Sequence, residues 1–110
     1  MEHEVHAVAD ALVVALRGEV DLEHSPRARA VLLKAVEDAA SVLVDLSGVT
    51  YIDSSGVASL VEGYQTAKKS KLRFGLIGVS EAALNVLRLA RLDKVFPIHA
   101  TLGDRIQADG

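Results

Sequence analysis

Continuous apolar runs alternate along the chain with stretches of a longer hydrophobic period. Residues 11–16 form an almost unbroken apolar run after a weakly alternating stretch at 5–9, and Asp10 between them predicts a turn, so we expect an opening β-hairpin. The run at 41–46 is apolar at nearly every position, which is typical of a central strand covered on both faces. Residues 72–78 predict a further strand.

Three other segments show the spacing of an amphipathic helix, with apolar residues three and four positions apart. These residues are Ala28, Val31, Leu32, Ala35, Val36 and Ala39 in the first segment, Val57, Leu60, Val61 and Tyr64 in the second, and Ala83, Leu84, Leu87 and Ala90 in the third. Ser25 followed by Pro26 predicts the N-cap of the first helix, and Ser80 predicts that of the third. A short edge strand is expected at 95–98, because Pro97 cannot donate a ladder hydrogen bond.

The order of the predicted elements is β-β-α-β-α-β-α followed by the short edge strand. This alternation predicts an α/β fold with a mixed sheet, in which right-handed helical crossovers join the parallel strands. In so short a chain we expect the helices to gather mainly on one face of the sheet. A weak helical turn is expected at 104–107 and a loose tail at 108–110.

The composition places the chain among soluble globular proteins. Its 110 residues suffice for one domain, which we expect to span 1–110 with a core at about 5–100. The net charge of −3 argues against a nucleic-acid-binding protein, since such proteins need a basic surface for the phosphates. The chain has no cysteine, no apolar run that could span a bilayer and no signal-peptide pattern, so we expect a cytoplasmic protein without membrane insertion.

Small polar residues gather at 51–57, between a hydrophobic approach and the second helix. This places the carboxylate of Asp53 and the hydroxyls of Ser54 and Ser55 at a helix N-terminus, where free N–H groups and the helix dipole favour an anion. A phosphate on a serine there would be held by the protein's own amides and would present about −1.5 to −2 charge to a docking protein. Ordinary N-capping and turns also prefer these residues, and the two roles are compatible.

A second polar cluster precedes the first helix. It consists of Gly18, Glu19, Val20 and Asp21, followed by Glu23 and His24. If the strand at 11–17 neighbours the strand at 42–46, this acidic loop lies beside the serines. Carboxylates there could hold a cation during phosphate transfer or tune docking through their charge. The alternative is a solvated, acid-rich turn that leads into the helix.

Patterns of catalysis, metal binding or cofactor binding are missing from the sequence. The four histidines form no H-E-x-x-H motif and no cluster with a third ligand, so we expect no metal. A serine hydrolase needs a G-x-S-x-G elbow, and Asp53 and Val57 occupy its two glycine positions around Ser55. The glycines form neither a dinucleotide-binding nor a phosphate-binding loop. We therefore expect a protein without cofactor or catalytic residues, and not an enzyme.

Four segments of the chain form a combination that is more specific than any one of them. They are Gly18-Glu19-Val20-Asp21, Val42-Leu43-Val44-Asp45-Leu46, Ile52-Asp53-Ser54-Ser55-Gly56-Val57 and Leu76-Ile77-Gly78-Val79-Ser80. In order and spacing, over about residues 5–100, this combination resembles the STAS domain of bacterial anti-sigma factor antagonists. The resemblance implies a STAS-like mixed sheet with an opening hairpin, βα crossovers and helices mainly on one face.

In that family a partner that is both anti-sigma factor and kinase phosphorylates the second serine of the motif. The resemblance implies that Ser55 is the acceptor and that Asp21 and Asp53 are its acidic neighbours. Ser54 would be the local cap, and Gly56 would belong to the same phospho-site environment. The unphosphorylated protein would bind the anti-sigma factor and free the sigma factor, and a serine phosphatase would reset the switch. An alternative within the family is a cytoplasmic subunit of a phospholipid-trafficking ABC transporter, whose ATPase would be the partner.

Overall fold

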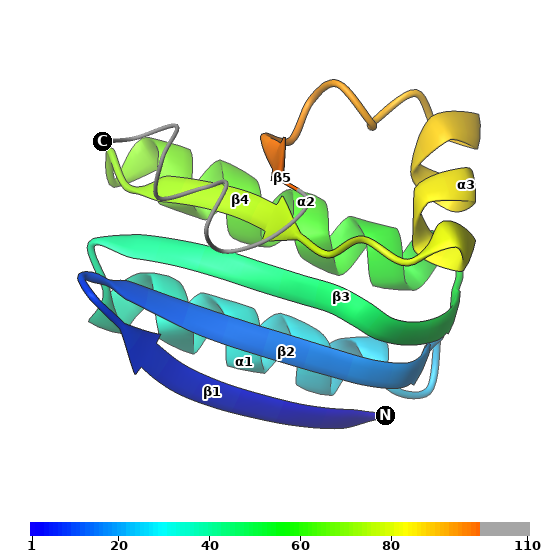
Figure 1. The fold of residues 1–110 in the computed structure, drawn as a ribbon, viewed down its shortest axis with the longest axis horizontal. Helices are drawn as coiled ribbons and strands as arrows, with labels where there is room; N and C mark the ends of the chain where they lie inside the picture. Colours follow the sequence, from blue (N-terminus) through cyan, green and yellow to red (C-terminus); the bar gives the residue numbers. More distant parts are fainter. Residues whose placement is uncertain (100–110) are drawn as a thin grey trace.

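A five-stranded mixed sheet and three helices make up the computed structural model, which describes residues 1–99 (Figure 1). The elements are β1 (Glu2–Val8), β2 (Ala11–Val20), α1 (Ser25–Asp38), β3 (Ser41–Ile52), α2 (Ser54–Lys69), β4 (Arg73–Ile77), α3 (Glu81–Leu89) and β5 (Ile98–His99). This order confirms the predicted succession of strands and helices and the α/β fold class.

The strands lie in the order β1-β2-β3-β4-β5, and β1 alone runs antiparallel to its neighbour. β1 and β2 form the opening hairpin that the sequence predicts. β2 and β3 are parallel, and their pairing runs from Ala11 with Ser41 to Val20 with Ile52. Because the two strands are paired to their last residues, both end at the same edge of the sheet. The loops that follow them therefore start side by side.

The helices bury their apolar faces against one side of the sheet, and Figure 1 shows α1 and α2 behind the strands. Val14 of β2 and Val44 of β3 form one core with Leu32 of α1 and Leu60 of α2, and all four are at most 1% exposed. Complete burial of a side chain of this size stabilises the fold by about 1.5–3 kcal/mol. Leu43 is buried on the opposite face of β3, which explains why this strand is apolar at nearly every position.

β3 is longer than the apolar run that predicts it. It continues past residue 46 to Ile52, beside β2, which itself extends to Val20. The pairing shifts register between Ala15 and Arg17 and again after Gly18, and such irregularities let paired strands bend without separating. Gly18 has a φ of +85°, which a residue without Cβ adopts readily.

Three local predictions are wrong. The N-cap of α1 is His24, and Ser25 is the first helical residue, with no side-chain cap at this end. Ala90 is the exposed C-cap of α3 and does not face the core, because the helix ends at Leu89. The edge strand β5 has two residues and starts after Pro97, whose carbonyl accepts a hydrogen bond from the backbone N–H of Leu76 at 2.8 Å.

Ser80 caps α3 as predicted, since its hydroxyl oxygen accepts a hydrogen bond from the backbone N–H of Ala83 at 3.2 Å. The turn predicted at 104–107 and the tail predicted at 108–110 lie outside the described residues. Within residues 1–99, each helix is too short or too polar to cross a membrane.

Candidate functional site: the serine loop

Two loops meet where β2 and β3 end. We call residues 53–56 the serine loop and residues 19–24 the acidic loop. The parallel pairing of β2 with β3 brings them together, which confirms the neighbourhood expected from the sequence. The backbone N–H of Asp53 donates to the carbonyl of Val20 at 3.4 Å, directly at the junction of the two loops.

The carboxylate of Asp53 joins the two loops. Its Oδ1 accepts hydrogen bonds from the backbone N–H groups of Ser55 at 3.0 Å and Gly56 at 3.1 Å, so Asp53 is the N-cap of α2. The same oxygen accepts the hydroxyl of Ser55 at 2.5 Å, and Oδ2 accepts the backbone N–H of Leu22 at 3.1 Å. Led by the hydroxyl of Ser55, these donors stabilise the ionised form and hold the pKa of Asp53 below its usual value, although burial opposes them.

Ser54 does not cap α2, which corrects the role expected for it. Its side chain is exposed and makes no hydrogen bond within residues 1–99. The reason is the extended backbone of Asp53, with φ −110° and ψ −173°, which turns the carboxylate back over the first N–H groups of the helix. Ser54 is left as a hydroxyl on the surface beside Ser55.

Ser55 is half-buried, and its hydroxyl donates to the Asp53 carboxylate. A hydroxyl donating to a carboxylate at 2.5 Å is a short, charge-assisted hydrogen bond. The carbonyl of Ser55 accepts the buried hydroxyl of Ser59 at 3.1 Å, and that hydroxyl also lies 3.2 Å from the carbonyl of Ser25 in α1. Ser59 therefore ties the start of α2 to the start of α1 and fixes the backbone at Ser55.

Gly56 is buried where α2 touches the end of β2. A Cβ at this position would lie 2.3 Å from the carbonyl oxygen of Val20 and 2.7 Å from Cγ1 of Ile52. No side chain fits without moving the backbone. The role of Gly56 in the loop is thus to let α2 begin directly against the sheet, which sets the position of Ser55.

Asp21 and His24 form a pair in the acidic loop. Oδ1 of Asp21 lies 2.6 Å from Nδ1 of His24 and accepts the backbone N–H of His24 at 3.2 Å. Burial raises the pKa of Asp21, but the hydrogen bonds and charge of His24 outweigh this, so the pKa lies below its usual value. The sequence analysis placed His24 in the same polar cluster as Asp21 but did not predict this contact. Oxygen and nitrogen atoms of Asp21, Glu23 and His24 lie within 4.8 Å of one another, as expected for acid-rich loops with or without a cation.

Two large apolar side chains stand exposed beside the serines. Leu22, in the acidic loop, is 75% exposed, and Tyr51, near the end of β3, is 51% exposed. The backbone of Leu22 is held by its hydrogen bond to Asp53, so this leucine is presented from an ordered position. Sequence reasoning did not select either residue. The available signal was an apolar residue between Asp21 and Glu23, where a solvated turn would favour polar ones.

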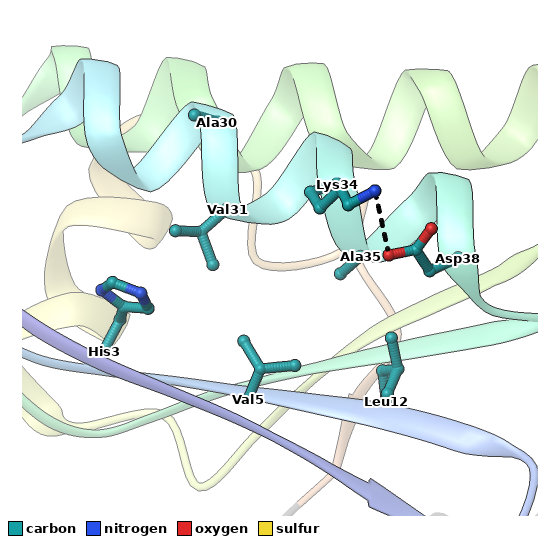
Figure 2. A pocket seen from close by; sticks show the side chains of 8 residues that line it. All are labelled: His3, Val5, Leu12, Ala30, Val31, Lys34, Ala35 and Asp38. Carbon is teal, nitrogen blue, oxygen red and sulfur yellow. Dashed lines mark ion pairs between the residues drawn. The ribbon is translucent and has the colours of Figure 1, made fainter.

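A separate apolar groove of about 410 Å³ lies between β1 and α1 (Figure 2). Val5 and Leu12 of the sheet point toward Val31 of the helix, and the ion pair between Lys34 and Asp38, at 3.5 Å, lies at its margin. None of its lining residues belongs to the serine loop or the acidic loop. The serine loop is thus separate from this groove.

The fold and the site define a small binding domain, with a mixed sheet, helices on one face and a serine on the surface at the start of the second helix. A family model described as "Mlab, STAS domain" matches residues 3–102. The chain therefore belongs to the STAS domain family.

Known relatives point to the same family. The anti-sigma-B factor antagonist of Bacillus subtilis is 28% identical over 87 residues, which cover 79% of this chain and 80% of that protein. The crystal structure of an anti-sigma factor antagonist from Mycobacterium paratuberculosis is 29% identical, with a TM-score of 0.88 over 97% of this chain and 92% of the other. Unphosphorylated SpoIIAA shares the fold, with 20% identity and a TM-score of 0.81 over 97% and 95% of the two chains. Bacillus SpoIIAA has also been solved in its phosphorylated form, with a TM-score of 0.75 and 20% identity over 99% and 100%.

Proposed function

We propose that this protein is a phospho-switched anti-sigma factor antagonist. Unphosphorylated, it binds an anti-sigma factor that is also a serine kinase, and thereby releases a sigma factor in the cytoplasm. Phosphorylation of Ser55 ends this binding, and a serine phosphatase restores it. The observation that carries the proposal is the half-buried Ser55 at the start of α2, whose hydroxyl is bonded to Asp53 and which has exposed apolar side chains nearby.

The surface around Ser55 fits protein docking in the unphosphorylated state. Leu22, 75% exposed, and Tyr51, 51% exposed, offer apolar area to a partner, and Ser54 offers an exposed hydroxyl that makes no hydrogen bond within residues 1–99. Docking would remove this apolar area from water, at roughly 25 cal/mol for each Å². Glu19 and Glu23 are exposed at the margin, so the matching partner surface would carry Lys or Arg around an apolar centre.

The hydrogen bond between Ser55 and Asp53 also suits phosphoryl transfer. As the bond from Ser55 Oγ to the γ-phosphorus of ATP forms, the bond from that phosphorus to the ADP oxygen breaks, and the hydroxyl proton must leave. The Asp53 carboxylate lies 2.5 Å from Oγ and is placed to accept this proton. The kinase would supply the nucleotide and its metal ion, and this chain would supply the acceptor and its orientation.

A phosphate on Ser55 would oppose docking without unfolding the domain. It adds about −1.5 to −2 charge within reach of the Asp53 carboxylate, and the ester oxygen has no proton left to donate to Asp53. Covering this dianion with a partner surface costs desolvation and brings it near any acidic group of the partner. A STAS fold tolerates both states, since SpoIIAA has been solved with and without the modification.

Phosphorylation by the cognate kinase tests this function. The protein is incubated with the purified kinase and ATP, and the modified residue is identified by mass spectrometry. We expect one phosphate on Ser55 in the wild type and in Ser54→Ala, and none in Ser55→Ala. Ser54→Ala is the matched control, because it removes an adjacent hydroxyl that makes no hydrogen bond within residues 1–99. Phosphate on another residue, or no phosphate with the genuine partner kinase, would refute the proposed switch at Ser55.

A second candidate is a subunit of a phospholipid-trafficking ABC transporter. The description of the matching family model, "Mlab, STAS domain", favours keeping it, since such subunits carry STAS domains. In this case the surface around Ser55 would bind the ATPase of the transporter without obligatory phosphorylation. Equal affinity of the wild type and the Ser55-phosphorylated protein for a purified transporter ATPase, with no affinity for an anti-sigma factor, would select this candidate.

A further inference from the structure

The charges of this chain are divided along its length. Residues 63–99 carry seven Lys and Arg against two Asp and Glu, whereas residues 1–62 carry four against eleven. Ion pairs join Glu4 with Arg17, Arg29 with Glu62 and Lys34 with Asp38 in the acidic part. In the basic part, Lys68 and Lys69 have no ion-pair partner among residues 1–99, so their charge is available to another molecule, and a charge asymmetry of this kind signals an interaction.

A groove of about 690 Å³ lies on this basic part, between α2 and the segment that follows α3. One wall is a single face of α2, with residues at intervals of three and four positions: Val61, Tyr64, Gln65, Lys68 and Lys69. The other wall consists of Leu92 and Val95. The groove thus has apolar walls with two exposed lysines at the C-terminal end of α2, and none of the lining residues within 1–99 is Asp or Glu.

Both walls of the groove are ordered. The ring of Tyr64 packs edge-on against Phe96 and Phe74, with centroid distances of 5.3 and 6.1 Å. The backbone N–H of Leu92 donates to the carbonyl of Leu87 at 2.8 Å, and that of Val95 to the carbonyl of Leu92 at 3.0 Å. Val95 nevertheless remains 43% exposed. A preformed groove with exposed apolar side chains reduces the ordering cost of binding.

We propose that this groove binds an acidic amphipathic helix of a second partner protein, independently of the serine loop. The lining face of α2 runs from Val61 to Lys69, about 12 Å at 1.5 Å per residue, which matches about two turns of a bound helix. Apolar side chains on one face of that helix would fill the space between Tyr64 and Val95. Its Asp and Glu residues would lie against Lys68 and Lys69, which have no ion-pair partner among residues 1–99.

The shape of the groove favours an acidic helix over a lipid bilayer or a single-stranded nucleic acid. A bilayer requires several protruding apolar side chains, whereas Val61, Tyr64 and Leu92 are half-buried walls of a hollow and Val95 is the exposed apolar residue among the described lining residues. Single-stranded nucleic acid requires exposed aromatic faces, and Tyr64, the aromatic residue of this groove, is packed against two phenylalanines. The groove begins at Val61, six positions after Ser55 and about 9 Å along α2, and none of its lining residues belongs to the serine loop, so we expect a ligand in the groove to leave the serine loop uncovered.

A defined peptide tests the proposal with the full chain. The probe is a fluorescein-labelled helical peptide of about 16 residues, with Leu at every third or fourth position and Glu elsewhere, and its control has Lys in place of every Glu. We expect the Glu peptide to bind in a salt-sensitive way, with NMR shift changes at 61–69 and 92–95, and the Lys peptide not to bind. Lys68→Glu should weaken binding about fivefold or more, and Val95→Gln a few-fold, whereas Lys71→Glu, an equal charge change outside the groove lining, should change it less than twofold.

Every other outcome of these measurements overturns the proposal. Binding to phosphatidylserine-containing vesicles but not to the Glu peptide would assign the surface to a membrane. Self-association in sedimentation velocity that Lys68→Glu abolishes would assign it to a second copy of the chain. Shift changes at the serine loop, or loss of peptide binding in Ser55→Asp, would contradict independence from the switch. If none of the probes bound, the basic surface would be an ordinary solvated surface and the proposal would be wrong.

Discussion

Replacing Gly56 with alanine is expected to destabilise the domain, although alanine is the better helix former. The added Cβ would lie 2.3 Å from the carbonyl oxygen of Val20, whereas ordinary carbon–oxygen contacts are no shorter than about 3.3 Å. The start of α2 must therefore retreat from β2 by about 1 Å. Retreat would also stretch the hydrogen bonds that Asp53 makes to Ser55 and Gly56.

The size of the effect follows from two opposing contributions. Overpacking of a rigid site costs about 1–3 kcal/mol, and at Gly56 the clashing atom is backbone, which puts the cost at the upper end. Alanine recovers at most about 1 kcal/mol of helix propensity. We therefore expect a net loss of about 1–2 kcal/mol in the free energy of unfolding. The matched control is Gly63→Ala, in the middle of α2, where the nearest atom is a Phe74 ring carbon at 3.2 Å and the ring can shift.

Urea denaturation measures both variants against the wild type. Gly56→Ala should lower the urea concentration at the midpoint of unfolding. The dependence of the unfolding free energy on urea should stay the same, because unfolding still exposes about the same surface area. Gly63→Ala should stay within about 1 kcal/mol of the wild type, because propensity offsets the tighter contact. Equal stability of Gly56→Ala and wild type would refute the close approach of α2 to β2 from which the position of Ser55 is derived.

Three further predictions concern the serine loop and the acidic loop. Ser55→Asp should weaken binding of the anti-sigma factor at least tenfold by titration calorimetry while the melting temperature stays nearly unchanged, and an unfolded Ser55→Asp would show that the hydroxyl is structural. Leu22→Ala should weaken the same binding several-fold and leave stability within about 0.5 kcal/mol, because this side chain is 75% exposed; unchanged affinity would exclude it from the interface. The pKa of Asp53 in the folded state is below its ordinary value of 3.8. The ionised Asp53 carboxylate therefore stabilises the fold fully above about pH 3.8, and this stabilisation is lost as the pH falls through the folded-state pKa. Acid denaturation of Asp53→Asn should therefore be less steep than that of the wild type below about pH 4, and identical curves would contradict the Asp53 contacts.

The sequence predicted the order of elements and the location of the site because both depend on short-range patterns. Apolar periodicity identified the strands and helices, and the small polar residues at 53–56 marked a helix start. Parallel pairing then followed from the βαβ order, which correctly placed the acidic loop beside Ser55.

The sequence did not reveal which polar residue caps α2 or which side chains contact one another at the site, because these roles depend on backbone angles and tertiary contacts. Asp53 and Ser54 are equally good caps by composition, and the extended backbone of Asp53 decides between them. The contact of His24 with Asp21 requires the turn that starts α1, and the exposure of Leu22 follows from its backbone bond to Asp53 across 31 positions. Burial of Gly56 against Val20 likewise joins residues that lie far apart in the sequence.

The affinity of a purified anti-sigma factor for the two forms of the protein tests the central claim most directly. The protein is phosphorylated stoichiometrically on Ser55, and both forms are titrated into the anti-sigma factor at the same salt concentration. We predict tight binding of the unphosphorylated form and a loss of at least a hundredfold on phosphorylation, about 2.7 kcal/mol, of which dephosphorylation restores the whole. Equal affinities of the two forms would contradict the claim.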